Sequence, residues 1–282
     1  MYWLSKNSRR SYKEYGMKYL IAKNLDDALT LREENPNFTL LFGASDIALK
    51  MKNNQVSGVV DLTHLDELSY IRKNENSIKI GALTTINAIL QNRDITQFIP
   101  ILSEASKEFA SHQIRNIASL AGNVANASPV ADMIAPLLVL NAKVTLLSSK
   151  GERTIFLSDL IIGFKSLDLN NEIITSFEIE IQKRQHYYRK VGPRAKLNIA
   201  KLSLAMVKQD ERYFISGASL NPYVKRFTNL EELLNGKNYS DVDIKEAMDK
   251  DISPSGSFRS TKEYRRKVLF NMLGEALGKF AI

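Results

Sequence analysis

Ala-Ser-Leu-Ala-Gly-Asn-Val-Ala-Asn-Ala-Ser-Pro-Val-Ala-Asp, residues 118–132, is the stretch of this sequence that decides the fold. Its small residues let the backbone approach a ligand closely, and backbone N–H groups at the start of a helix suit a phosphate. Asn126 and Asp132 could hydrogen-bond hydroxyl groups of the same ligand. The pattern predicts either a loop that holds a phosphate- and sugar-bearing cofactor or a tight loop before a helix that Ser128 and Pro129 begin.

A second candidate loop, Gly43-Ala44-Ser45-Asp46, follows a short apolar strand that we predict over residues 38–42. A turn of this composition can point consecutive N–H groups into one concavity. The same residues are also typical of a plain strand-to-helix turn capped by Ser45 or Asp46. Two such loops in one chain could hold one diphosphate from two sides, and this conjunction is more informative than either loop alone.

The bulk composition is that of an ordinary globular protein. The chain has 282 residues, of which 44% are hydrophobic and 25% are charged, which is enough for two domains with a substantial core. No apolar run reaches the length of a membrane span. The net charge is +8, but lysine and arginine are scattered. We therefore expect a basic surface that attracts an anionic nucleotide or a partner protein, rather than nucleic acid or a membrane.

The absence of cysteine excludes several kinds of chemistry. Disulfides, thiolate metal sites, cysteine nucleophiles and an iron–sulfur cluster held by this chain are all ruled out. The composition fits a reducing compartment, and we expect a cytoplasmic protein. His64, His112 and His186 are isolated from one another, so we expect no metal site. The glycine signatures of Rossmann and P-loop proteins are absent as well.

Hydrophobic periodicity predicts a mixture of helices and strands. We expect helices over residues 26–34, 86–91, 101–111 and 129–140, where Pro136 could kink the last one. We expect strands over residues 57–62, 77–83, 143–147, 154–157 and 172–181. Beyond a polar stretch at 182–186, we expect strands within 187–221, short helices over 230–234 and 242–248, and a long helix over 261–280.

The order of several segments resembles a known family. These segments are 40–47, 61–68, 80–82, 113–116 (Gln-Ile-Arg-Asn) with 118–132, 172–174, 190–194 (Lys-Val-Gly-Pro-Arg) and 258–266. Together they resemble the flavin-binding subunit of molybdenum-containing hydroxylases, the xanthine dehydrogenase family. The resemblance implies an α+β protein, in which a two-subdomain PCMH-type FAD-binding fold precedes a small C-terminal α/β domain like that of CO dehydrogenase flavoproteins. We place a basic N-terminal extension at 1–16 and these two domains at 17–183 and 184–282.

The same resemblance implies FAD bound non-covalently, with backbone N–H groups of both loops on its pyrophosphate. Phe109 would lie along the flavin or adenine, Ile174 would be an apolar contact, and Lys190 a basic contact near the isoalloxazine. Otherwise Phe109 and Ile174 would be core residues and Lys190 a surface cation. The implied cofactor-binding residues are Leu41, Phe42, Gly43, Ala44, Ser45, Asp46, Ile47, Phe109, Ala118, Ser119, Gly122, Asn123, Asn126, Asp132, Ile174 and Lys190.

The chain departs from the family at both loops, where Gly43-Ala44 and Ala121-Gly122 stand in place of the Gly-Gly that relatives often have. Alanine can still lie near a phosphate if its φ is negative.

By resemblance, the chain is an oxidoreductase subunit that needs no catalytic residue of its own. An iron–sulfur subunit with 2Fe–2S clusters would pass electrons through FAD to NAD⁺ or another acceptor, while a molybdopterin subunit oxidises the organic substrate. Two alternatives stay open. One is a stand-alone flavoenzyme of the same fold, and the other is a non-enzymatic basic protein that binds nucleotide or nucleic acid.

Overall fold

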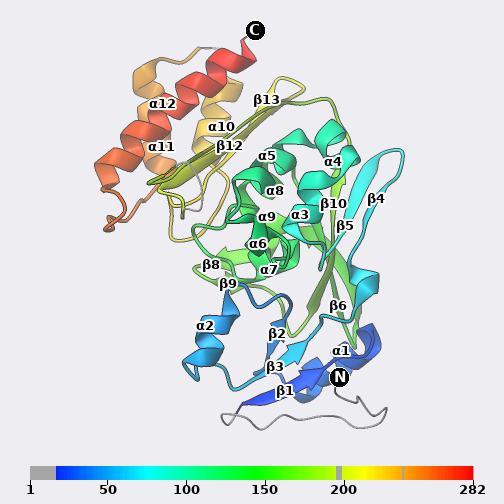
Figure 1. Cartoon of the computed structure of the whole chain (residues 1–282). Helices are drawn as coiled ribbons and strands as arrows, with labels where there is room; N and C mark the ends of the chain where they lie inside the picture. The colour runs from blue at the N-terminus through cyan, green and yellow to red at the C-terminus, as the bar shows by residue number, and fades with distance from the viewer. Residues whose placement is uncertain (1–16, 195–198, 237, 282) are drawn as a thin grey trace.

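The computed structural model describes residues 17–194, 199–236 and 238–281, and these form an α+β protein, as expected (Figure 1). The described part contains two three-stranded sheets, one five-stranded sheet and a two-stranded hairpin. The basic extension predicted over residues 1–16 lies outside the described residues.

The first sheet is parallel and has the strand order β1-β3-β2. Its elements are β1 (Lys18–Ile21), α1 (Leu25–Glu34), β2 (Thr39–Leu41), α2 (Ile47–Lys52) and β3 (Gly58–Asp61). Parallel strands need crossover connections, and here α1 and α2 supply them. All four residues of β3 are buried, whereas α2 has no buried residue at all. The helix α2 therefore contributes no buried side chain to hold the loop between β2 and α2.

The second sheet is antiparallel, in the order β4-β5-β10-β6-β7, and carries a layer of helices. Its strands are β4 (Ile71–Lys73), β5 (Ser77–Gly81), β6 (Lys143–Ser148), β7 (Gly151–Phe156) and β10 (Ile173–Glu180). The other elements of this region are η1 (Asp66–Leu68), α3 (Ile86–Gln91), α4 (Arg93–Phe98), α5 (Pro100–Glu108), α6 (His112–Arg115), α7 (Leu120–Ala125), α8 (Ile134–Val139), α9 (Leu157–Leu160), β8 (Ile161–Gly163) and β9 (Ser166–Leu167). Ile80, Phe177 and Leu137 belong to the single core between this sheet and its helices.

The third sheet lies between two sets of helices. It consists of β11 (Gln185–Val191), β12 (Leu202–Gln209) and β13 (Arg212–Ser216), followed by α10 (Thr228–Asn235), α11 (Asp241–Asp251) and α12 (Lys262–Phe280). Side chains alternate across a strand. Leu204 and Met206 of β12 therefore enter the core with α10–α12, whereas Ala205 and Val207 enter the core shared with α5 and α8. Both faces of this sheet are buried.

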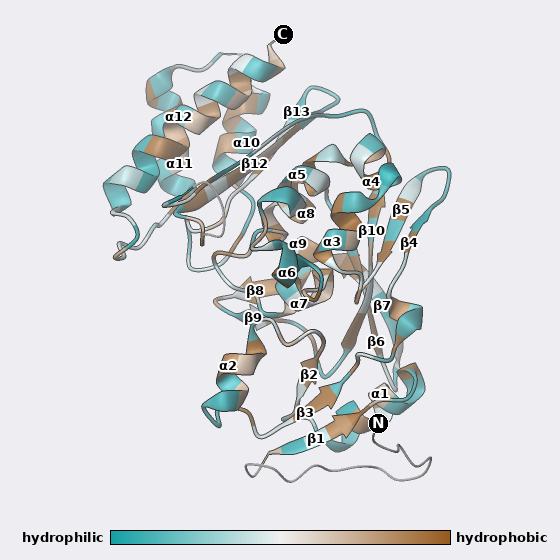
Figure 2. Cartoon of the chain, viewed as in Figure 1, coloured by the Kyte–Doolittle hydropathy of each residue, from teal (hydrophilic) through white to brown (hydrophobic). Residues whose placement is uncertain are grey.

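The surface patterning agrees with this packing. In Figure 2, α12 shows alternating brown and teal bands, because Leu269, Met272 and Leu273 face the core while charged residues face outward. Threonine caps begin two of the helices, with Thr85 accepting from Ala88 N–H at α3 and Thr261 accepting from Tyr264 N–H at α12. No helix among the described residues is long and apolar enough to cross a membrane.

Two of the expected helices have different bounds in the structure. The helix predicted over 101–111 ends at Glu108, because Phe109 is extended and Ala110 adopts a positive φ of 35°. Ser111 then caps the separate helix α6.

The helix predicted over 129–140 begins only at Ile134, so the prediction that Ser128 and Pro129 start it is wrong. Ser128 instead closes a turn, in which its carbonyl accepts from Ala131 N–H. Pro136 therefore falls in the first turn of α8, where a missing N–H group leaves no intrahelical bond unmade.

Candidate cofactor site

The loop from β2 to α2 holds two consecutive residues in the left-handed region, Gly43 with φ 63° and Ala44 with φ 51°. Ala44 therefore does not have the negative φ under which alanine could most easily lie near a phosphate. This conformation is less stable by roughly 1–2 kcal/mol for an L-residue that carries a Cβ atom. The loop imposes it because Ala44 N–H donates to Phe42 O at 2.8 Å while Ala44 O accepts from Ala48 N–H at 3.1 Å.

This loop leaves several backbone donors without an acceptor. Within the described ranges, the N–H groups of Gly43, Ser45, Asp46 and Ile47 make no hydrogen bond. Successive free N–H groups in a turn of this kind form a concavity suited to an anion. The first loop thus has the backbone chemistry of a phosphate-binding loop.

The structure brings the two candidate loops together at Gly43. A Cβ atom placed on Gly43 would lie 1.8 Å from the carbonyl oxygen of Ile117. Only glycine permits this approach, and its positive φ favours glycine too. The first loop therefore packs directly against the residue that precedes the segment 118–132.

The segment 118–132 is not an open loop, because it contains the helix α7. Ser119 caps this helix, and its Oγ accepts from Gly122 N–H at 3.0 Å. Ala118 N–H donates to Ile114 O at 2.8 Å. The N–H groups of Ala118 and Gly122 are thus already engaged within the chain, unlike those of the first loop.

The donors that this segment can offer are mainly side chains. Asn123 uses its Oδ1 to accept from Met133 N–H at 3.1 Å, which leaves its amide NH₂ group available. The Asn126 side chain makes no hydrogen bond within the described part of the chain, and the same holds for Ser119 N–H.

Asp132 and Lys190, distant in sequence, form a buried ion pair. Lys190 Nζ lies 2.7 Å from Asp132 Oδ2 and 3.1 Å from the carbonyl oxygen of Glu108. The Lys190 side chain is 3% exposed, so the alternative of a surface cation is wrong. The pair joins β11 to the segment 118–132.

The second oxygen of this carboxylate, Asp132 Oδ1, is buried and has no hydrogen-bond partner among the described residues. Burial raises the pKa of Asp132 from 3.8 to about 6, against the opposing effect of Lys190. An unsatisfied buried carboxylate oxygen is costly, and a bound group that donates a hydrogen bond would relieve it.

Ile174 and Phe109 are connected to this region through the backbone. Ala82 N–H donates to Thr175 O at 2.9 Å and Ala82 O accepts from Ala121 N–H at 3.0 Å. Through these two backbone hydrogen bonds, Ala82 links β10, next to Ile174, to α7. Phe109 follows Glu108, whose carbonyl holds Lys190, and is itself 9% exposed. Both side chains are buried, as core residues would also be.

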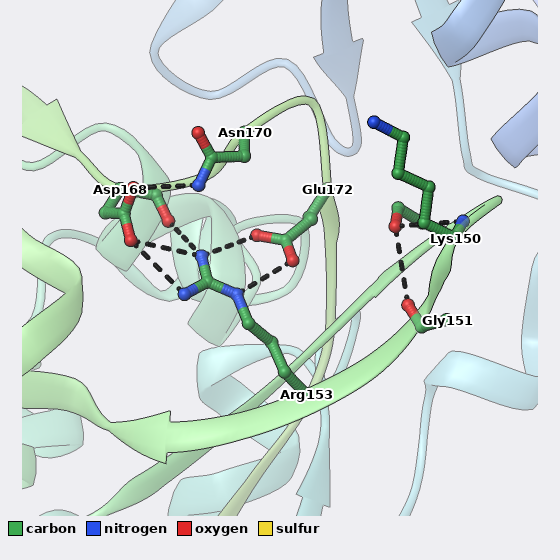
Figure 3. A network of polar contacts seen from close by, with 7 residues as sticks. Lys150, Gly151, Arg153, Asp168, Asn170 and Glu172 are labelled. Carbon is green, nitrogen blue, oxygen red and sulfur yellow. Dashed lines mark hydrogen bonds and ion pairs between the residues drawn. The ribbon is translucent and has the colours of Figure 1, made fainter.

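A polar network fixes the entry into β10, ahead of Ile174 (Figure 3). Arg153 on β7 donates to both carboxylate oxygens of Glu172, at 2.8 and 2.7 Å. It also donates to the carbonyl oxygen of Asp168 at 2.6 Å, and Asn170 donates to Oδ1 of the same residue at 2.9 Å. Bidentate pairs of this kind hold their partners in one geometry, so the position of Ile174 is well defined.

Two residues at this site were missed from the sequence. Ile117 gives the carbonyl that meets Gly43, and its side chain is exposed. The Tyr188 hydroxyl is buried, and burial raises its pKa well above the usual value, with Asp132 and Glu108 contributing. The period of two in β11 could have indicated Tyr188, because it lies on the same strand face as Lys190.

Other features of the surface lie apart from these residues. One hollow is lined by residues such as Asn74, Glu178 and Lys143, and another by residues such as Phe98, Arg184 and His186. Neither is lined by a predicted cofactor-binding residue. Within the described ranges, no cluster of histidine and acidic residues could hold a metal ion.

Fold and site together define an α+β protein with a loop of unpaired backbone N–H groups and a buried ion pair, within the described residues. Residues 13–179, more than half of the chain, match the family described as the FAD binding domain in molybdopterin dehydrogenase. Residues 186–280 match the CO dehydrogenase flavoprotein C-terminal domain. The chain therefore belongs to the family of FAD-binding subunits of molybdenum hydroxylases, as the sequence motifs implied, and it is an oxidoreductase subunit.

Individual relatives resemble the chain over most of its length. The glyceraldehyde dehydrogenase medium chain of Sulfolobus acidocaldarius is 29% identical, over 89% of this chain and 93% of its own length. A xanthine dehydrogenase FAD-binding subunit of Escherichia coli is 26% identical, over 93% of this chain and 94% of its own.

Solved structures share the fold. A chain of the carbon monoxide dehydrogenase from Hydrogenophaga pseudoflava superposes with a TM-score of 0.87 at 22% identity, covering 93% of this chain and 96% of that one. A chain of quinoline 2-oxidoreductase from Pseudomonas putida 86 gives a TM-score of 0.84 at 20% identity, covering 95% and 99%.

Proposed function

We propose that the loop 41–47 and the segment 118–132 hold FAD non-covalently between them. The free N–H groups of Gly43, Ser45, Asp46 and Ile47 carry this proposal, because they are backbone donors with no acceptor in the described chain. They lie in a loop that packs against Ile117. The pyrophosphate of FAD supplies the anionic oxygens that such donors bind.

The remaining predicted residues have complementary roles in this proposal. The Ser119 N–H and the amide groups of Asn123 and Asn126 donate to the cofactor, and Asp132 Oδ1 accepts from one of its donors. Phe109 and Ile174 give apolar contacts. Lys190 acts mainly through Asp132, because its ammonium group is held by that carboxylate and by Glu108 O. Bound FAD supplies the isoalloxazine that carries electrons, and the protein supplies position and electrostatics.

We further propose that the flavin receives electrons from an iron–sulfur subunit and passes them to NAD⁺ or another acceptor. A molybdopterin subunit would oxidise the organic substrate. The names of two relatives support this arrangement, because they describe parts of larger enzymes. One is a glyceraldehyde dehydrogenase medium chain, and the other is a xanthine dehydrogenase FAD-binding subunit. With no cysteine, the 2Fe–2S clusters must lie in a partner subunit. The domain boundaries at 16/17 and 183/184 belong to the same proposal.

The cofactor proposal is tested on the purified chain. Acid precipitation should release all flavin to the supernatant, and chromatography should identify it as FAD. Flavin that stays with the pellet, or FMN, would contradict the proposal.

Electron transfer is tested separately and without oxygen. NADH should reduce an artificial dye through the bound flavin, whereas purines, aldehydes and N-heterocycles should leave the flavin oxidised when no partner subunit is present. Bleaching by one of these organic substrates would instead identify a stand-alone flavoenzyme.

A further inference from the structure

A tight turn ahead of α12 presents an aromatic side chain to solvent. Ser257 N–H donates to Ser260 O at 3.0 Å, and Ser260 N–H donates to Ser257 O at 3.2 Å. Phe258 and Arg259 form the tip, in the orange segment that precedes α12 in Figure 1. This segment belongs to the motif 258–266, which contributes no residue to the proposed cofactor site.

A buried arginine fixes this turn to the body of the protein. Arg265, which is 7% exposed, donates through Nε to Ser260 Oγ at 2.7 Å and through a terminal nitrogen to Ser257 Oγ at 3.2 Å. Its other terminal nitrogen donates to Ser219 O at 2.6 Å. Ser219 N–H in turn donates to Pro129 O at 2.7 Å. The turn is thus anchored on the segment that follows β13 and, through Ser219, on the segment 118–132.

The tip itself contributes little to folding. Phe258 is 92% exposed, and the Arg259 guanidinium lies 4.5 Å from the centre of its ring. Aromatic residues and arginine are enriched in the parts of protein interfaces that contribute most to affinity. A tip that is rigid before binding also loses little entropy when a partner docks.

The charge around the turn indicates the kind of partner. Arg259 lies at the tip and Lys262 begins α12, with one acidic residue, Glu263, in the same turn of the helix. Arg265 is buried and bonded internally, so it adds no surface charge. Lys201 lies nearby, stacked at 4.9 Å on Tyr264 of the first turn of α12. A second copy of this chain would bring the same positive charges against them, which opposes association.

We propose that the Phe258 turn docks a different subunit of the complex, which offers an apolar socket rimmed by carboxylates. This inference rests on the proposed function, because it requires that the chain works within a multi-subunit oxidoreductase.

The test uses the chain co-expressed with its iron–sulfur and molybdopterin subunits, and the complex is identified by its iron and molybdenum content. The chain is then titrated against the separated partner subunits. We expect Phe258→Ala to weaken binding at least about 30-fold, as for an interface hot spot, and Phe258→Tyr to retain it. Phe156→Ala is the control, because Phe156 is another exposed aromatic (47%) at the end of β7. Flavin content and thermal stability should be unchanged in all three variants.

A second variant tests the charge of the socket. Arg259→Glu should weaken binding more than Phe258→Ala does, and wild-type affinity should fall as salt is added. Equal or tighter binding by Arg259→Glu would overturn the acidic rim. Wild-type binding by Phe258→Ala, or equal losses in Phe258→Ala and Phe156→Ala, would overturn the docking turn. So would self-association of the chain that Phe258→Ala abolishes.

A failure of the proposed function would be seen in a different measurement, the iron and molybdenum content of the wild-type complex. If the wild-type chain co-purifies with neither iron nor molybdenum, the proposed function is wrong, whatever the variants do.

Discussion

The loop 41–47 and the segment 118–132 have similar small-residue composition but offer a ligand different chemistry. In the first loop, four backbone N–H groups have no acceptor among the described residues, and Gly43 and Ala44 are in the left-handed region. The segment forms the capped helix α7 and uses the N–H groups of Ala118 and Gly122 internally. It presents amide and carboxylate side chains instead.

The difference follows from what supports each region. The helix after the first loop has no buried residue, so the loop is held by its own turn geometry and by the contact of Gly43 with Ile117. The segment contributes Leu120 and Val124, both fully buried, to the main core. The helix α7 and its cap pair backbone groups of the segment, as buried backbone groups require, so mainly side chains remain for a ligand.

The largest effect should come from Gly43→Ala. The new Cβ would collide with Ile117 O at 1.8 Å, and the loop would have to move away from the segment. We expect a loss of more than about 3 kcal/mol in FAD affinity, beyond roughly 100-fold, measured as flavin retained after gel filtration. The control is Gly274→Ala on α12, where a Cβ meets nothing within 4 Å. That variant should retain flavin and gain up to about 1 kcal/mol in stability. Full flavin occupancy in Gly43→Ala would mean that the two regions do not act together.

The buried carboxylate of the segment should give a pH dependence that the first loop lacks. The pKa of Asp132 is raised from 3.8 to about 6, so between these values the folded chain holds a proton that the unfolded chain has released. The free energy of unfolding should therefore fall as pH rises from about 4 to 6, by up to about 1.4 kcal/mol per pH unit and about 3 kcal/mol in total.

Chemical denaturation of the flavin-free protein at several pH values measures this slope. Asp132→Asn should remove the contribution, whereas Asp46→Asn, at an exposed position of the first loop, should keep the wild-type slope. The same slope in Asp132→Asn as in the wild type would exclude Asp132 as its source.

Two asparagines of the segment should separate ligand binding from stability. Asn126→Ala removes a side chain with no internal partner, so FAD affinity should fall roughly tenfold or more, by about 1.5 kcal/mol, at unchanged stability of the flavin-free protein. Asn123→Ala also leaves Met133 N–H without its acceptor, so it should in addition lower stability by about 1–3 kcal/mol. Isothermal titration with FAD and thermal melts distinguish the two. Equal melting temperatures for both variants would show that the Asn123 bond does not support the segment.

The smallest effect should come from Ala44→Gly. Glycine relieves the left-handed strain of roughly 1–2 kcal/mol at φ 51° but loses about 0.5–1 kcal/mol through greater freedom of the unfolded chain. We expect a net gain of between about 0 and 1.5 kcal/mol in stability, with FAD affinity unchanged or slightly higher. Ala44→Val, which is β-branched, should be destabilised instead. A loss of stability in Ala44→Gly would show that the alanine methyl group makes a contact that stabilises the folded protein.

The sequence was most predictive where local chemistry decides the structure. The long helix near the C-terminus and the alternating strands are present in the structure where expected. The family motifs predicted both the α+β fold and the family that the comparisons show. Predictions failed in the segment 118–132, where Ser119 begins a helix instead of Ser128. Both serines satisfy the local preference for a cap, and only the packing of α7 against the core distinguishes them.

By itself, the sequence determined the kind of protein and the residue types available to a cofactor. Small residues and helix caps act on their immediate neighbours in the chain, and the lack of cysteine follows from the composition alone. Only the tertiary structure decided which backbone donors stay free, why Ala44 has a positive φ, and that Lys190 is held by Asp132. The contact of Gly43 with Ile117 is likewise visible only there. These features depend on residues far apart in the chain, whose approach is set by the burial of both faces of β12 and by the core beneath α7.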